Sequence, residues 1–162
     1  MPSDQPSRHK AQVAWRSEGD FLSGRYARRH DISFDGGVVV TGSASPDVVP
    51  LPYALAEAVD PEEMFVASLS ACHMLWFLDL CRRAGFAAAS YVDQAEGLLE
   101  PGENGRLQIT EVSLRPCVAF QGPAPTSAAL LELHEAAHGQ CFLAASTRAR
   151  IRIEPQPSYG SA

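Results

Sequence analysis

The sequence predicts an α+β fold in which a long buried helix and a second helix are wrapped by antiparallel sheets. Three observations predict it: an apolar stretch of helical length over residues 60–85, short alternating runs before and after it, and an amphipathic stretch beginning at Thr126. The 162 residues can form one core, and 46% hydrophobic and 20% charged residues are typical of globular chains. We expect a single domain over residues 11–155, a flexible N-terminal tail over residues 1–10 and a C-terminal tail over residues 156–162.

The long helix has clear signals at both ends. Asp60 is a suitable N-cap, Pro61 suits the first helical position, and Glu63 lies three residues after the cap, where its side chain can bond back. Gly85 is a natural stop. Apolar residues fall on nearly every side of the helix, which predicts that it is buried all round.

Strands are expected on both sides of this helix. Before it, residues 12–15, 25–34 and 38–41 have strand patterns, and Asp35, Gly36 and Gly37 form a hairpin turn signal. Residues 43–52 are rich in proline and predict a loop that leads into the helix. After the helix, residues 90–99, 106–119 and 147–153 alternate like strands, and the second helix starts at Thr126.

The charge pattern excludes some classes of protein. The net charge is −6 and basic residues occur in no run longer than a pair, which argues against a nucleic-acid binder. The polar start of the chain predicts no secretory signal. The long helix has about 16 apolar residues in unbroken sequence, against roughly 20 for a membrane span. We therefore expect a soluble, cytoplasmic protein that binds no membrane.

Four cysteines are present, at positions 72, 81, 117 and 141. In a cytoplasmic chain thiols stay reduced, so these residues are core filler, redox-active thiols or metal ligands. Cys72 has small neighbours and Cys141 ends the second helix close to Gly139, a flexible position that suits a thiol that moves to meet a partner. Cys81 lies about 13 Å along the helix from Cys72, too far for a disulfide, and we assign it and Cys117 to packing.

His134, His138 and Cys141 give a competing interpretation. Residues spaced i, i+4 and i+7 share one helix face, and histidine and cysteine are zinc ligands. Gly139 interrupts this face, and no fourth ligand is evident in the sequence. Two ordinary polar histidines are therefore the simpler interpretation, and we expect no metal site.

Two segments resemble the OsmC/Ohr family of osmotically inducible and organic hydroperoxide resistance proteins. They are DPEEMFVASLSACHM at residues 60–74 and AHGQCFLAAS at residues 137–146. The resemblance extends over most of residues 11–155, so the expected domain is OsmC-like. It implies an intertwined homodimer whose two long helices are wrapped by sheets, with two sites at the subunit interface.

The resemblance also implies a cysteine-based peroxidase with an antioxidant role in stress response. Cys72 matches the thiol that attacks the hydroperoxide and becomes a sulfenic acid, and Cys141 matches the one that resolves it as a disulfide. Glu62 matches the active-site carboxylate, and Arg28, with Arg25 as the second choice, matches the arginine that holds the thiolate. No cofactor is implied beyond an external dithiol reductant.

Substrate specificity is expected from the apolar helix. Phe65, Leu69 and Trp76 would favour an organic hydroperoxide over hydrogen peroxide. His73 follows the reactive cysteine where the characterised peroxidases have an apolar residue. We assign it to the substrate-binding residues, as a base or donor near Cys72; the alternative is a polar residue that faces away from Cys72. The proline-rich segment at residues 43–53 replaces a glycine-rich loop of those enzymes. On a straight helix, Glu62 and Cys72 would stand about 15 Å apart, so a shared site needs a break in the helix or a bridging arginine.

Two alternatives stay open. One is a non-catalytic OsmC-like protein that binds a small apolar ligand or a metal in the same pocket, with His134, His138 and Cys141 as metal ligands. The other is a structural dimer without chemistry.

Overall fold

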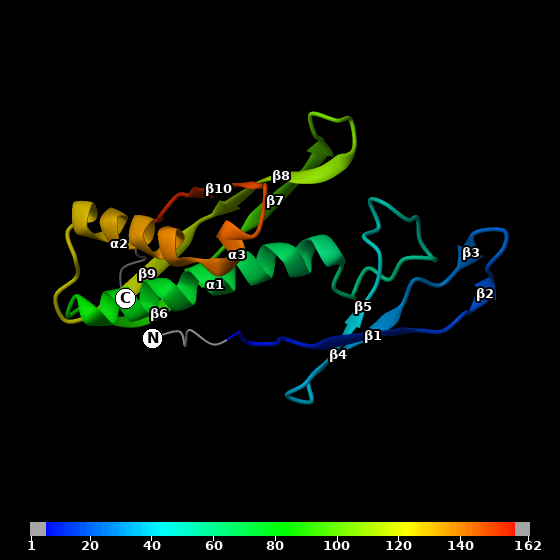
Figure 1. Ribbon diagram of the computed structural model, residues 1–162, viewed down its shortest axis with the longest axis horizontal. Coiled ribbons are helices and arrows are strands. Elements are labelled where there is room, and N and C mark those ends of the chain that lie inside the picture. The colour runs from blue at the N-terminus through cyan, green and yellow to red at the C-terminus, as the bar shows by residue number, and fades with distance from the viewer. Residues whose placement is uncertain (1–5, 158–162) are drawn as a thin grey trace. The chain divides into compact units, whose positions relative to one another are not determined.

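A computed structural model describes residues 6–157 of the chain. It divides into two compact units, Met1–Pro61 and Glu62–Ala162, and each is described by itself (Figure 1). The fold is a mixed α+β one, as predicted. The expected tails, residues 1–10 and 156–162, lie partly outside the described residues.

The first unit consists of short strands. Strands β1 (Ala11–Trp15), β4 (His30–Phe34) and β5 (Val39–Gly42) form an antiparallel sheet in the order β1-β4-β5. Strands β2 (Gly19–Asp20) and β3 (Arg25–Tyr26) form a separate hairpin. The single strand expected over residues 25–34 is thus two strands. The reason is that the Ala27 and Arg28 amides donate instead to the Glu18 and Tyr53 carbonyls.

This unit buries few large apolar side chains. Strand β1 is exposed along its whole length, and Val13 and Val39 are 66% and 60% exposed. The two clusters of buried apolar residues that the structure describes both belong to the second unit. The sheet of the first unit therefore presents apolar surface that its own residues do not cover.

The second unit is built on helix α1 (Pro61–Arg83), which runs without a break. Its buried residues are Leu69, His73, Phe77 and Cys81, spaced every fourth position, so one stripe of the helix is buried. Leu75 is 63% exposed. The prediction of a helix buried on every side is therefore wrong for this chain taken alone.

Helix α1 is also long and apolar enough to cross a membrane by length and composition, with 22% of its most apolar window buried inside the chain. The sequence-based expectation that it is too short is therefore not met. The core helix of a globular protein meets the same criterion, so length and composition do not decide where this helix lies.

Two sheets pack along the buried stripe of α1. Strands β6 (Ala87–Asp93) and β9 (Pro116–Gln121) pair antiparallel, and so do β7 (Glu96–Pro101) and β8 (Leu107–Leu114). Strand β10 (Arg150–Ile153) pairs with β8 in parallel, which differs from the expectation of purely antiparallel sheets. The strands expected over residues 90–99 and 106–119 are each broken in two.

One carboxylate links these two breaks. Asp93 ends β6, and its Oδ1 accepts a hydrogen bond of 2.6 Å from the backbone N–H of Arg115, which lies between β8 and β9. Its Oδ2 accepts a hydrogen bond of 2.5 Å from Ser70 Oγ on α1. Both breaks are therefore tied to the central helix at the same point.

The second half of α1 also packs against helix α2 (Ser127–Gln140). Thr126 caps α2 by accepting a hydrogen bond of 3.2 Å from the Ala129 amide, as its sequence position predicts. Cys141 ends α2 and is also the N-cap of the short helix α3 (Phe142–Ala145). The chain therefore turns at Cys141, between two helices.

Candidate active site

Two thiols from distant parts of the sequence meet where α1 faces the junction of α2 and α3. Cys72 is half-buried near the middle of α1, and Cys141 is 3% exposed at the junction. The two side chains are hydrogen bonded to each other. Cys141 Sγ also accepts a hydrogen bond of 3.4 Å from the Ala144 amide, which fixes its direction. Both cysteines are free thiols.

The surroundings of Cys141 keep it protonated. Burial, followed by the hydrogen bond and charge interaction with Cys72, raises the pKa of the Cys141 thiol to about 11. The proximity of Cys72 thus adds to the effect of burial, and both disfavour the thiolate form of Cys141.

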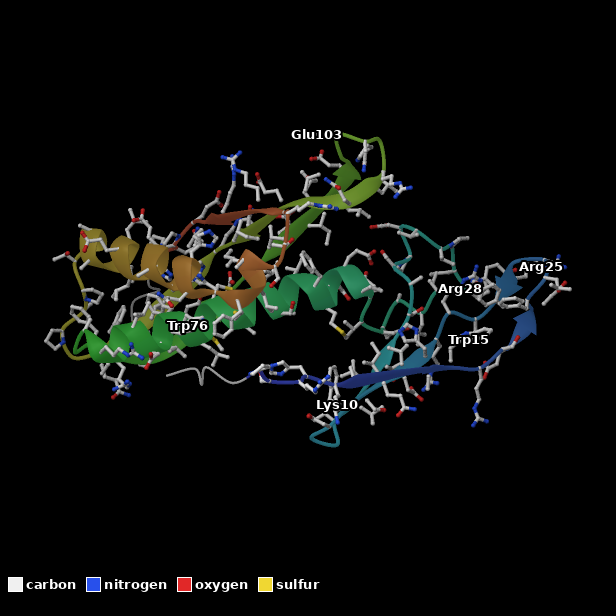
Figure 2. The ribbon with its side chains drawn as sticks, in the orientation of Figure 1. Lys10, Trp15, Arg25, Arg28, Trp76 and Glu103 are labelled. Carbon is white, nitrogen blue, oxygen red and sulfur yellow. The ribbon has the colours of Figure 1, made fainter. Side chains whose placement is uncertain are left out.

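Apolar side chains surround this pair. Trp76 lies one turn after Cys72 and meets Phe142, the residue after Cys141, in an edge-to-face contact with ring centroids 5.5 Å apart. Figure 2 shows Trp76 on α1. Leu75 on α1 and the α3 residues Phe142 and Leu143 are exposed hydrophobic residues of the two elements that carry this contact. The thiols thus lie beside apolar surface that the described residues do not cover.

His73 does not face the thiol that precedes it. It is 1% exposed, and its Nε2 lies 3.0 Å from Nδ1 of His134, which is 0% exposed. Burial, aided by His138 for His73 and by His73 for His134, lowers the pKa of each imidazole to about 4. The assignment of His73 to the substrate-binding residues is therefore wrong, because its ring is enclosed in the contact between α1 and α2.

The sequence gives a signal that each histidine is buried, but the local pattern does not predict that the two histidines bond to each other. His73 stands between Leu69 and Phe77 on the buried stripe of α1, and His134 shares a face of α2 with Ala137 and Cys141. A polar residue in the middle of an apolar stripe needs a partner. Only the tertiary structure shows which one it is.

The described residues do not form the metal site that the alternative interpretation requires. Among residues 6–157, no group of three or more histidine, cysteine or acidic side chains could hold a metal ion. His134 is turned toward His73, and Cys141 toward Cys72. The set His134, His138 and Cys141 is therefore not assembled.

Glu62 lies in the first turn of α1 and is half-buried. Because the helix has no break, ten residues separate Glu62 from Cys72 by about 15 Å along the axis. The structure thus does not bring this carboxylate to the thiol of the same helix. A common site would require a long side chain or residues of another chain between them.

The two candidate arginines lie in the first unit and differ in their contacts (Figure 2). The Arg28 guanidinium stacks on the Tyr26 ring, 3.6 Å from its centroid, and donates to the Gly24 and Tyr26 carbonyls. Arg25 forms a 3.1 Å ion pair with Asp20 on exposed surface. Arg28 is therefore held in one orientation without a carboxylate partner among these contacts, whereas Arg25 already has one.

The residues expected to bind substrate separate into two groups. Leu69 is 1% exposed and packs with Val112 and Leu114, and Phe65 packs against the same cluster. Leu69 is a core residue, which corrects its assignment as a pocket residue. Trp76, by contrast, is half-buried close to the thiols.

Comparison with known proteins shows the family of the chain. The family model described as OsmC-like protein matches residues 54–156, which include both thiols. The chain belongs to the OsmC-like protein family. A solved OsmC-like protein of unknown function from Vibrio cholerae is 41% identical, with a TM-score of 0.91, over 93% of this chain and 100% of that one.

Solved structures of organic hydroperoxide resistance proteins share the OsmC-like fold. The one from Elizabethkingia anophelis is 20% identical, with a TM-score of 0.69, over 98% of this chain and 100% of that one. OhrB of Bacillus subtilis is 20% identical, with a TM-score of 0.59, over 91% of this chain and 97% of that one. No curated protein matches the chain.

Proposed function

We propose that this OsmC-like protein is a thiol-dependent peroxidase that reduces organic hydroperoxides. The observation that carries the proposal is the hydrogen bond between the Cys72 and Cys141 thiols. It is supported by the fold shared with organic hydroperoxide resistance proteins. The two roles come from the family resemblance: Cys72 attacks, and Cys141, whose pKa is raised, resolves.

The reaction has two steps on the protein. The Cys72 thiolate attacks the distal oxygen of the hydroperoxide, the O–O bond breaks, and the alcohol leaves after taking up a proton. Cys72 becomes a sulfenic acid. The Cys141 sulfur then attacks the Cys72 sulfur, and the Cys141 proton leaves with the hydroxyl group as water. The resulting disulfide is reduced by a dithiol through two exchange steps.

Arg28 and Glu62 enter the proposal through the family resemblance. The guanidinium would stabilise the Cys72 thiolate, and Glu62 would orient the guanidinium. The Arg28 guanidinium is already held by an aromatic ring and two carbonyls, so its position costs little further ordering. The apolar surface at Trp76 and Phe142 suits an organic substituent on the peroxide better than hydrogen peroxide.

A homodimer is part of the same proposal. The first unit leaves β1 exposed, and α1 buries a single stripe, so each unit has apolar surface that a second copy can cover. We expect the protein to act in the cytoplasm without a bound cofactor or metal, and to bind neither nucleic acid nor membrane.

The test is the consumption of cumene hydroperoxide with a dithiol reductant. We expect turnover by the native protein, none by Cys72→Ser, and a single turnover that stops at the sulfenic acid in Cys141→Ser. Cys117→Ser is the matched control, since Cys117 lies on β9 with its Sγ 3.3 Å from the Pro157 carbonyl. Unchanged turnover in Cys72→Ser would contradict the proposal.

The alternative is a non-catalytic protein that binds a small apolar ligand beside the thiols. The exposed Leu75, Phe142 and Leu143 favour it. Under this alternative, the native protein consumes no hydroperoxide, and an apolar fluorescent probe binds equally to the native protein and to Cys72→Ser.

A further inference from the structure

The bond between His73 and His134 joins α1 to α2 inside the second unit. The ring centroids are 5.3 Å apart and the ring planes are inclined by only 8°, so the two rings meet edge to edge. The His134 ring also stacks on Phe77, with centroids 4.1 Å apart. Both imidazoles are fully buried and 61 residues apart in the sequence, so their contact is purely tertiary.

Packing alone does not explain this pair. His73 Nδ1 and His134 Nε2 are buried and have no hydrogen-bond partner among the described residues. In either arrangement of the neutral rings, one N–H and one lone pair are therefore left without a protein partner. Two apolar side chains of similar size would leave no polar atom unsatisfied, so they would fill the same space at lower cost.

The pair stands next to the thiols on both helices. His73 immediately follows Cys72 on α1. His134 and Ala137 lie on α2 and Cys141 is its C-cap; all three are buried. His134 contacts His73 and Cys141 contacts Cys72, so both face α1. A directional bond at His134 therefore fixes how α2 is rotated about its axis and how far it is shifted along α1. A helix rotated by one residue, about 100°, would carry Cys141 away from Cys72.

We propose that His73 and His134 are positioning residues whose hydrogen bond holds Cys141 against Cys72. Apolar packing is tolerant of small shifts and rotations, whereas a hydrogen bond between two rigid rings is directional. The bond thus raises the effective concentration of one thiol at the other. This inference concerns the two thiols of the proposed function, but it does not require that they reduce a hydroperoxide.

The test measures how readily the two thiols form a disulfide, without any hydroperoxide. In a glutathione buffer, the two protein thiols and one oxidised glutathione give the protein disulfide and two reduced glutathione molecules, so electrons and protons balance. The equilibrium constant is obtained by quenching with an alkylating agent and counting modified thiols by mass spectrometry. Urea unfolding of the reduced protein is measured in parallel.

The decisive variant replaces both histidines, as His73→Leu with His134→Leu. We expect the disulfide to become at least tenfold less favourable, while the reduced protein is as stable as the native one or more stable. If the histidines only supported the fold, their replacement would lower the disulfide equilibrium constant and the free energy of unfolding together. His138→Gln, on the same helix but outside the pair, is the control and should leave the disulfide constant within threefold of the native value.

A conservative variant should keep the native disulfide equilibrium constant. His134→Asn places an amide where Nδ1 stood, so it keeps a polar partner for His73, and we expect a disulfide constant close to the native one. His134→Leu lacks this partner and should lose at least tenfold. This single-site comparison also decides the question if the double leucine variant fails to fold.

Two results would overturn the inference: an unchanged disulfide constant in the folded double leucine variant, or no disulfide between Cys72 and Cys141 in the native protein. The proposed function fails separately. A native protein that consumes no hydroperoxide, but whose disulfide constant drops in the leucine variant, would contradict the peroxidase and retain the positioning pair.

Discussion

The side chains of Cys141 and Cys72 are hydrogen bonded to each other, although Cys72 lies in the middle of a long helix and Cys141 lies between two later helices. Burial and the neighbouring Cys72 raise the pKa of Cys141 to about 11, so at neutral pH this thiol keeps its proton. The first prediction concerns this pKa.

In Cys72→Ala, the pKa of Cys141 should fall from about 11, because the hydrogen bond and the charge interaction that raise it are removed. It should remain above the ordinary thiol value of 9.0, because burial is the largest cause of the shift. The measurement is the rate of Cys141 alkylation against pH, followed by mass spectrometry. Cys117→Ala should leave this profile unchanged, and an unaltered profile in Cys72→Ala would contradict the contact.

The second prediction separates the two candidate arginines. Arg28→Ala should slow the oxidation of Cys72 by an organic hydroperoxide by about a hundredfold, as is typical for removal of one preorganised charge. Arg25→Ala should have little effect, because Arg25 is exposed and already paired with Asp20. The rate is followed by stopped-flow with a dithiol trap. The reverse order of the two effects would assign the role to Arg25.

Arg28→Lys should resemble Arg28→Ala rather than the native protein. The Arg28 guanidinium lies over the Tyr26 ring while its Nη1 donates to two carbonyls, and a lysine ammonium has no flat group that could stack on the ring in the same way. Full recovery of the rate by lysine would mean that only the charge matters.

The contacts that decide the site show what local sequence can and cannot predict. The start of α2 follows from Thr126 and that of α1 from Pro61, because caps and first-turn residues act within a few positions. Local sequence does not predict the break at Asp93, because its partners Ser70 and Arg115 are distant in sequence. The His73–His134 bond is not predictable from local sequence for the same reason.

The third prediction concerns self-association. Leu75 is an apolar residue of α1 and is 63% exposed in the single chain, so Leu75→Glu should weaken a homodimer that covers this side of α1. Sedimentation velocity should show a dimer for the native protein and a shift toward monomer for the variant. Leu107→Glu is the control, since Leu107 is 66% exposed on β8. A monomeric native protein would contradict the proposed homodimer.

The fourth prediction concerns the carboxylate at the strand breaks. Asp93→Ala removes the acceptors of the Arg115 amide and the Ser70 hydroxyl, and should lower the free energy of unfolding by about 2 to 4 kcal/mol. Ser70→Ala removes one of these bonds and should cost about 1 to 2 kcal/mol. Urea denaturation measures both. Equal losses in the two variants would mean that the bond to Arg115 contributes nothing.

The last prediction is the pH dependence of stability. Burial lowers the pKa of His73 and of His134 to about 4 from 6.5, with His138 contributing for His73. A histidine whose folded pKa is lowered takes up its proton first in the unfolded state. The native state is therefore fully stable above about pH 7 and loses stability as the pH falls from 6.5 toward 4, with no further loss below.

The size of this loss follows from the shift. A pH of 5 is about 1.5 units below the unfolded pKa of a histidine. Each of the two imidazoles therefore lowers the free energy of unfolding at pH 5 by about 2 kcal/mol. Urea unfolding at pH 7.5 and pH 5.0 measures the difference. This difference in unfolding free energy should shrink markedly in the double variant His73→Leu with His134→Leu. It should persist in His9→Asn, because His9 is exposed. Tyr91, which contacts Phe77 beside the pair, does not contribute, since burial raises its pKa far above this range. An undiminished pH dependence in the double leucine variant would place the responsible groups elsewhere.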